Sequence, residues 1–167
     1  IGLNNFKKGD GYSSRQISGW SNRYLKSKTN DIKEMDFVIN WLSKNQQSKE
    51  VFSLIHNDYK YDNIVLNKDY TKILGILDWE MATIGNPLFD LGTTLGYWVQ
   101  ENDHPLLKKI SLSPTTSSGN LSRTEIVNFY KKYSKIQVND PVFYYVFGLF
   151  KISVIVQQIY FRYKSGY

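Results

Sequence analysis

The chain has 167 residues, of which 41% are hydrophobic and 22% are charged, values typical of one globular domain with its own core. It contains no cysteine, which excludes disulfide frameworks, cysteine nucleophiles and cysteine metal sites, and fits a reducing, cytoplasmic location. The net charge is +6, but the lysines are spread along the chain, so a solvated basic surface is favoured over nucleic-acid binding.

The first fifty residues predict a loop, over residues 1–12, and then two helices packed on each other. Each helix is preceded by a polar residue with Glu or Gln three positions later, the pattern of a capping box. The two pairs are Ser13 with Gln16 and Asp31 with Glu34. Apolar residues recur at helical spacing behind each pair, which predicts helices over 14–27 and 31–44.

Residues 53–80 predict a strand, a polar loop and an antiparallel hairpin. The strand is Ser53 to Ile55, and it enters the loop from His56 to Asn63. Two apolar runs, 64–66 and 72–77, flank turn residues and form the arms of the hairpin.

Groups suited to phosphoryl transfer gather at the open end of this hairpin. Counting outward from about Tyr70, Asn63 falls beside Asp78, and Asp58 lies one loop away. Amide and carboxylate oxygens suit Mg²⁺, which makes Asn63 and Asp78 the predicted metal ligands. Asp58 is suited to accept the proton of an acceptor hydroxyl, and Lys60 could reach the transferring phosphoryl oxygens.

The remaining polar residues of the loop have structural interpretations. His56 is more typical of a hydrogen-bonded structural group than of a catalytic base. Asn57 suits a sharp loop, because asparagine tolerates left-handed backbone. A merely solvated hairpin end would account for any one of these residues, but poorly for all of them in this order.

A helix over 87–100 begins with Asn86 as N-cap and a first-turn proline. Gly92 and Gly96, four residues apart, predict the close approach of another backbone, which compensates their low helix propensity. Asp90 either stabilises the N-terminus of this helix or points inward and fixes the catalytic loop.

The remaining residues predict helices around a surface loop. Residues 111–120 are of low complexity and are expected to be a mobile loop. Ser122 with Glu125 predicts a further capped helix, and the last helix runs from Pro141 to about residue 163. Because Lys151 and two glutamines interrupt its apolar run, we expect a core helix and no membrane span. The fold class is therefore α+β, mainly helical.

The motif H-x-D-x4-N of residues 56–63, followed by D-W-E at 78–80, resembles the aminoglycoside phosphotransferase and choline kinase superfamily. The nearer similarity is to the phosphotransferase family found beside, or fused to, acyl-CoA dehydrogenases, and residues 77–91 carry most of it. Asn57 departs from the glycine of most aminoglycoside-type members and is similar to choline kinases.

The resemblance implies a catalytic base at Asp58, Mg²⁺ ligands at Asn63 and Asp78, and a buried acid, Asp90, that supports the loop. It implies ATP as co-substrate. The fold implied is the C-terminal lobe of a protein-kinase-like fold with a small catalytic hairpin. In that fold, 1–167 is one domain, divided into two helices (1–50), the catalytic loop and hairpin (51–80) and a helical subdomain (81–167).

No nucleotide-binding lysine on a strand and no sheet-rich N-terminal lobe is recognisable in residues 1–50. We therefore expect that the N-terminal nucleotide-binding lobe of the same protein is absent from this chain and is the partner that this chain needs. The isolated fragment is expected to bind ATP unproductively and to be inactive.

The predicted function is ATP-dependent phosphorylation of a hydroxyl on a small-molecule metabolite. A choline- or ethanolamine-like kinase and a non-catalytic binding module remain alternatives. The acceptor stays open, because Tyr97 and Trp98, beyond Asp90, fit core packing as well as an acceptor pocket.

Overall fold

The computed structural model describes residues 11–47, 50–111 and 113–167; the predicted loop over 1–12 lies almost entirely outside them. The helices are α1 (Tyr12–Ser27), α2 (Lys33–Lys44), α3 (Pro87–Tyr97), α4 (Pro105–Lys109), α5 (Arg123–Ser134) and α6 (Pro141–Lys164). The strands are β1 (Ser53–Ile55), β2 (Ile64–Leu66), β3 (Ile73–Ile76) and β4 (Thr83–Gly85), with 3₁₀ turns η2 (Tyr61–Asn63) and η3 (Trp79–Met81).

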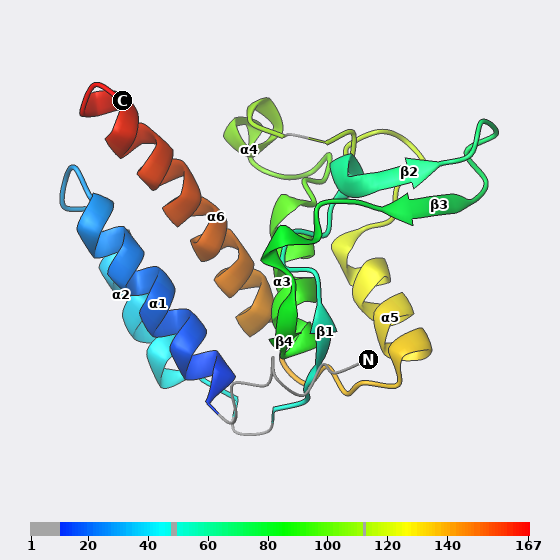
Figure 1. The fold of residues 1–167 in the computed structure, drawn as a ribbon, viewed down its shortest axis with the longest axis horizontal. Coiled ribbons are helices and arrows are strands. Elements are labelled where there is room, and N and C mark those ends of the chain that lie inside the picture. The colour runs from blue at the N-terminus through cyan, green and yellow to red at the C-terminus, as the bar shows by residue number, and fades with distance from the viewer. Residues whose placement is uncertain (1–10, 48–49, 112) are drawn as a thin grey trace.

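Helix α6 lies between the α1–α2 pair and α3, and the strands lie on the other side of α3 (Figure 1). The helices α3 and α6, which are rich in aromatic residues, form the centre of the core. Phe89 of α3 meets four rings edge to face: Tyr12, Phe143, Tyr144 and Phe147. Such pairs add about 0.5–1.5 kcal/mol each beyond the area that they bury.

The predicted close approach at the glycines of α3 is confirmed, and the partner is α6. A Cβ on Gly92 would overlap the carbonyl oxygen of Tyr144, and a Cβ on Gly148 would overlap the carbonyl oxygen of Gly92. A Cβ on Gly96 would meet the backbone of Gly148. The two helices therefore touch backbone to backbone.

By length and composition alone, α6 could cross a membrane. Its residues Phe143, Phe147 and Val154 are buried in the core against the neighbouring helices, which accounts for much of its apolar character. Toward its C-terminal end the helix is exposed, including Val156 and Ile159.

The strands form two separate antiparallel pairs, β1 with β4 and β2 with β3. The β2–β3 hairpin was predicted, and it is confirmed with Ile64 opposite Ile76. Strand β4 was not predicted, because Thr83 to Gly85 is too short to show alternation. It pairs with β1 so that Ser53 faces Gly85.

The predicted caps of α1 and α2 are wrong. α1 begins at Tyr12, and its N-terminal N–H groups donate to Glu50 instead of forming a Ser13–Gln16 box. Burial alone would raise the pKa of the Glu50 carboxyl, but these hydrogen bonds outweigh it and lower the pKa. α2 begins at Lys33 without a side-chain cap, because Asp31 pairs with Lys28 at 2.7 Å.

The caps predicted for later helices are confirmed. Asn86 accepts a hydrogen bond from the N–H of Leu88, and α3 ends at Tyr97, three residues earlier than expected. Ser122 and Glu125 form a complete capping box.

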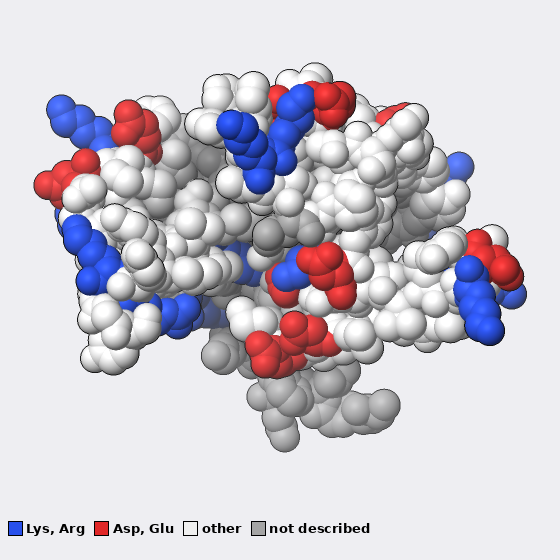
Figure 2. All heavy atoms as spheres, turned by 90° about the horizontal axis from the view of Figure 1, so that it is seen from above, with Lys and Arg blue, Asp and Glu red and all other residues white. Residues whose placement is uncertain are grey.

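Lys and Arg side chains are interspersed with Asp and Glu on the face seen in Figure 2, in small groups. That distribution agrees with the dispersed basic charge of the sequence.

Candidate active site

Three predicted site residues meet at one carboxylate. Asp58 Oδ2 accepts hydrogen bonds from Lys60 Nζ at 2.8 Å and from Asn63 Nδ2 at 3.2 Å. Asn63 Nδ2 also donates to the Asp58 carbonyl oxygen at 2.7 Å. The Asp58 side chain is 21% exposed, so it is anchored yet reachable from solvent.

Lys60 was expected to reach phosphoryl oxygens, but in the structure its ammonium lies on Asp58 and 5.0 Å from the ring centroid of Tyr97. Burial, with a smaller contribution from the Asp58 charge, raises the pKa of Tyr97 well above its usual value. Tyr97 is therefore a neutral hydroxyl beside the carboxylate, and it belongs to the site rather than to the core.

One face of α3 holds the loop. Asp90 Oδ2 accepts from the backbone N–H of His56 and Asp90 Oδ1 from that of Asn57, both at 2.8 Å. Thr94 Oγ1 donates to the Tyr59 carbonyl oxygen at 2.8 Å. Asp90, Thr94 and Tyr97 have i, i+4, i+7 spacing, a signal in the sequence that would have identified this polar face.

Of the two interpretations left open for Asp90, the geometry matches the inward-pointing one. Its carboxylate is mostly buried, and burial raises its pKa, while the two N–H donors and the Lys151 charge act to lower it. The two carboxylate oxygens fix two successive peptide groups, which sets the direction in which the next residue, Asp58, leaves the loop.

His56 is 3% exposed, and both of its ring nitrogens have partners. Nε2 lies 2.7 Å from the Leu77 carbonyl oxygen, and Nδ1 accepts from the Asp58 N–H at 3.2 Å. These partners require the tautomer with hydrogen on Nε2. The Trp79 ring packs 4.7 Å from the imidazole. Because neither nitrogen is left for substrate, His56 links the loop to the end of β3.

Asn57 has a φ of 68°, as its residue type suggested. Its amide donates to the Met81 carbonyl oxygen at 2.9 Å, and its own carbonyl accepts from Lys151 Nζ at 2.6 Å. Sequence reasoning missed this role of Lys151 and treated the residue only as an interruption of an apolar helix.

Lys151 is 4% exposed. Burial lowers the pKa of its ammonium to about 8, against the raising effect of the Asp90 and Asp58 charges. A single buried charge in an apolar helix costs free energy unless it is hydrogen-bonded or paired. The position of Lys151 in an apolar run was therefore a sign in the sequence that this lysine has a polar partner.

Asp78 lies one position beyond its predicted place. The N–H of Leu77 donates to the Asn63 carbonyl oxygen at 2.8 Å, so Leu77, and not Asp78, faces Asn63. The pairs Ile64–Ile76 and Val65–Gly75 are centred on Tyr70, so a count outward from Tyr70 itself reaches Leu77, and the prediction was one residue too far. Asp78 then turns out of the strand with a φ of 63° and is exposed.

The donor chemistry of Asn63 and Asp78 suits a magnesium ion. The Asn63 amide nitrogen is committed to Asp58, which leaves the amide oxygen for a cation. Among the described residues, the Asp78 carboxylate has neither a hydrogen bond nor an ion pair. The described segments contain no group of three or more His, Cys, Asp or Glu side chains placed so that they could together hold a metal ion. Magnesium needs only one or two protein carboxylates or carbonyls beside phosphate and water.

Residues 113–120 lie against this site. Asn120 Oδ1 accepts from the Tyr61 hydroxyl at 2.7 Å, and Thr115 is buried. The Tyr61 ring packs 5.0 Å from Trp98, whose indole N–H donates to the Leu121 carbonyl oxygen.

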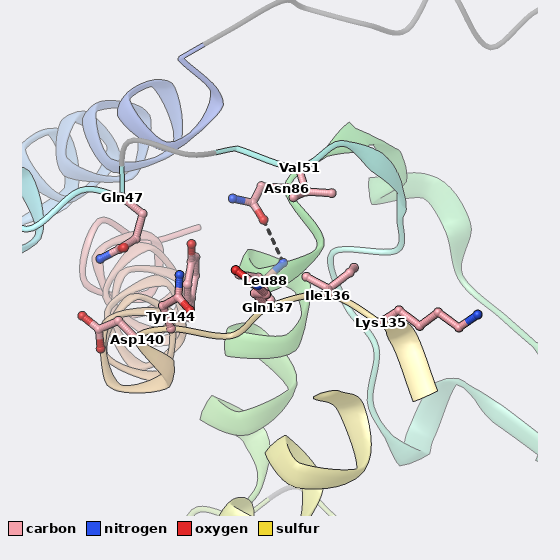
Figure 3. A pocket seen from close by; sticks show the side chains of 10 residues that line it. Gln47, Val51, Asn86, Leu88, Lys135, Ile136, Gln137, Asp140 and Tyr144 are labelled. Carbon is pink, nitrogen blue, oxygen red and sulfur yellow. Dashed lines mark hydrogen bonds between the residues drawn. The ribbon is translucent and has the colours of Figure 1, made fainter. Parts of the chain in front are cut away.

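A cavity of about 410 Å³ lies away from the loop, at the N-terminal ends of α3 and α6 (Figure 3). Asn86, Leu88 and Tyr144 line it. Since none of the predicted site residues reaches it, this cavity is not part of the candidate active site.

Comparison with known proteins gives the class. Residues 1–112 match the model of the phosphotransferase enzyme family (APH), which covers more than half of the chain. The chain therefore belongs to the phosphotransferase enzyme family, and it has the aminoglycoside phosphotransferase-like fold.

Among solved structures, a protein of Ralstonia eutropha provisionally assigned as an aminoglycoside phosphotransferase superposes with a TM-score of 0.84 at 28% identity. The match covers 99% of this chain and 50% of that one.

Similar full-length proteins include acyl-CoA dehydrogenase family member 11 of rat, 31% identical over 99% of this chain, and of human, 32% identical over 98%. Mouse acyl-CoA dehydrogenase family member 10 is 27% identical over 98%. The chain spans only 22%, 21% and 15% of these relatives' lengths. The similarity to dehydrogenase-associated phosphotransferases is thereby confirmed.

Proposed function

We propose that the protein containing this chain transfers the γ-phosphoryl group of ATP to a hydroxyl of a small-molecule metabolite. The observation that supports the proposal best is the Asp58 carboxylate, held by Lys60 and Asn63 at the mouth of the hairpin, one residue beyond a loop fixed by Asp90. A carboxylate that is anchored but accessible can align a hydroxyl and accept its proton.

The acceptor oxygen attacks the γ-phosphorus, the bond to the β-phosphate bridging oxygen breaks, and ADP leaves. Asp58 takes the hydroxyl proton, and Lys60 and Tyr97 keep its carboxylate oriented. Asn63 and Asp78 would hold Mg²⁺, which screens charge on the phosphates when bound. Positioning and charge stabilisation are the main contributions expected of a protein in this reaction.

The test uses the full-length protein, because the chain is a fraction of its relatives' length. With Mg-ATP and a panel of hydroxyl compounds, Asp58→Asn is expected to lower phosphorylated product by about 10²–10⁴-fold, the usual contribution of a general base. Asp69→Asn, an exposed carboxylate of the hairpin turn, is the matched control and should keep full activity.

Product is quantified by mass spectrometry together with ADP release, so that simple ATP hydrolysis is separated from transfer. Wild-type turnover by Asp58→Asn would refute the role of Asp58. Absence of product from the whole panel, with folded protein, would favour a non-catalytic binding module.

A further inference from the structure

A second cavity, of about 350 Å³, lies between α1, α6 and the catalytic loop. Its wall includes side chains of α1, the Asn57 turn and the segment that follows Asp78. The residues that matter to the argument are Tyr12, Arg15, Trp20, Arg23, Asn57 and Lys151. The Mg²⁺ ligands proposed above do not line it.

The described lining residues carry three cations, Arg15, Arg23 and Lys151, and no carboxylate. Arg23 lies 4.6 Å and Lys151 5.6 Å from the ring of Trp20, so one indole contacts both charges. Within the described segments, neither Arg23 nor Lys151 has a carboxylate at ion-pair distance.

Lys151 is the unusual member of this set. Its buried ammonium has three hydrogens, and one hydrogen bond, to the Asn57 carbonyl oxygen, is formed with the described residues. The nearby Asp90 carboxylate already accepts two backbone N–H groups. The hydrogen bond to the loop uses one of the three N–H groups of Lys151. A buried cation is stable only if further polar or anionic groups contact it.

The cavity holds a second buried donor. No described residue meets hydrogen-bond geometry with the Tyr12 hydroxyl, although the Asn57 side chain lies near enough to act as a donor to its oxygen and to lower its pKa. Burial raises its pKa to about 12, so it keeps its proton at neutral pH. The hydroxyl hydrogen is left without an acceptor among the described residues, and a ligand oxygen in this cavity would supply one.

The cavity adjoins the catalytic groups. Asn57 immediately precedes Asp58, and Met81 and Thr83, also in the wall, follow Asp78 within five residues. The Asp58 and Lys60 charges also act on the pKa of the Lys151 ammonium. A ligand group held here is therefore near the proposed base.

We propose that this cavity binds a carboxylate or phosphate group of the acceptor, so that the substrates are anionic hydroxyl compounds. Arg23, Lys151 and the Tyr12 hydroxyl are the donors to the anion, and neutral or cationic acceptors, such as choline, lack the group that this cavity recognises. That the bound anion belongs to an acceptor rests on the proposed phosphotransferase function, whereas the presence of an anion site does not.

Calorimetry on the full-length protein tests the site without turnover. Inorganic phosphate and acetate are titrated with Mg²⁺ and a non-hydrolysable ATP analogue at saturation, so that the nucleotide site is filled. Arg23→Gln is expected to weaken binding of the preferred anion by about tenfold, the effect of one charged hydrogen bond. Lys26→Gln, also an exposed cation of α1 but outside the cavity, should leave it unchanged.

Because Arg23 is exposed, its substitution should leave the core intact. Equal affinities of Arg23→Gln and wild type would overturn the proposal. So would the absence of binding by either anion up to about 20 mM, which is weaker than a useful subsite. Binding of the anion only when the nucleotide analogue is omitted would assign it to the nucleotide site instead.

Kinetics then distinguishes the two anionic groups. The acceptor pairs are glycerol 3-phosphate with glycerol, and 4-hydroxybutanoate with its amide. We expect the charged member of one pair to have a kcat/KM higher by about tenfold or more, and Arg23→Gln to remove that preference through KM. Preference for choline or for the neutral member of both pairs would contradict the proposal. If no acceptor is phosphorylated, the proposed function fails and calorimetry alone decides the anion site.

Discussion

The α3–α6 contact and the catalytic loop are stabilised in opposite ways. The helix pair is joined by glycines and aromatic rings, with backbones in contact. The loop and its hairpin rest on strands of three or four residues, with much apolar side chain exposed and left-handed residues at Asn57 and Asp78. Polar groups from the helices, at Asp90 and Lys151, fix the loop.

This contrast separates the two tasks. The helix pair stabilises the fold by burial and close packing. Such packing tolerates a change of apolar side chain better than a change in side-chain volume. In the loop, a few directed hydrogen bonds determine where Asp58 points. These bonds are sensitive to a change in the charge of the groups that form them and less sensitive to a change in side-chain volume. Substitutions should therefore fail for different reasons in the two regions.

The largest effect is expected from Gly148→Ala. Alanine is favoured over glycine in a helix by about 1 kcal/mol, but its Cβ would overlap the Gly92 carbonyl oxygen. Since backbone atoms cannot move aside cheaply, the free energy of unfolding should fall by about 3–4 kcal/mol. Urea denaturation measures it. Gly75→Ala is the matched control, because a Cβ there meets nothing within 4 Å; equal losses in the two variants would contradict the close-packing argument.

A pH-dependent effect is expected from Lys151→Met. The pKa of Lys151 is about 8 in the folded state and about 10.4 in the unfolded chain. Below pH 8 both states are protonated; between these values the folded state loses its proton first, so stability rises with pH. The unfolding free energy of wild type relative to Lys151→Met should increase by about 3 kcal/mol between pH 7.5 and 10.5. A flat difference over this range would show that Lys151 is not desolvated.

Asp90→Asn should act mainly on the loop. Asparagine has one acceptor oxygen where aspartate has two, so one of the N–H groups of His56 and Asn57 loses its partner. We expect about 2 kcal/mol less protection of these amides in hydrogen exchange, and reduced phosphoryl transfer. Asp69→Asn serves as control. Unchanged exchange at His56 and Asn57 would mean that Asp90 does not fix the loop.

The smallest effect concerns a helix outside both regions. Ser122→Ala removes the capping box of α5 and should lower the free energy of unfolding by about 1 kcal/mol. Ser118→Ala, in the preceding loop, is the control. A loss no larger than that of the control would indicate that the cap is not formed in solution.

Sequence patterns predicted the elements that depend on local chemistry. The α3 and α5 caps, the glycine contact and the β2–β3 hairpin follow from residues within a few positions of one another. The α1 start was missed because its cap, Glu50, lies 39 residues from Gly11. Long-range partners of this kind leave no local pattern.

The candidate site shows the same division. Asp58, Asn63 and Asp78 are recognisable by spacing within one hairpin, although the register was misplaced by one residue. Lys151 contacts Asn57 across 94 positions, and Tyr97 approaches Asp58 from a different helix. The sequence could indicate only that a lysine in an apolar helix needs a partner.

Glu50 also has a mechanical consequence. One carboxylate accepts from three consecutive N–H groups at the start of α1 and sits three residues before β1, the strand that enters the catalytic loop. We therefore expect a displacement of α1 to move the stem of that loop as well. The cavity wall with Arg23 and the turn with Asp58 should move together. A ligand that contacts Arg23 should then also change the position of Asp58.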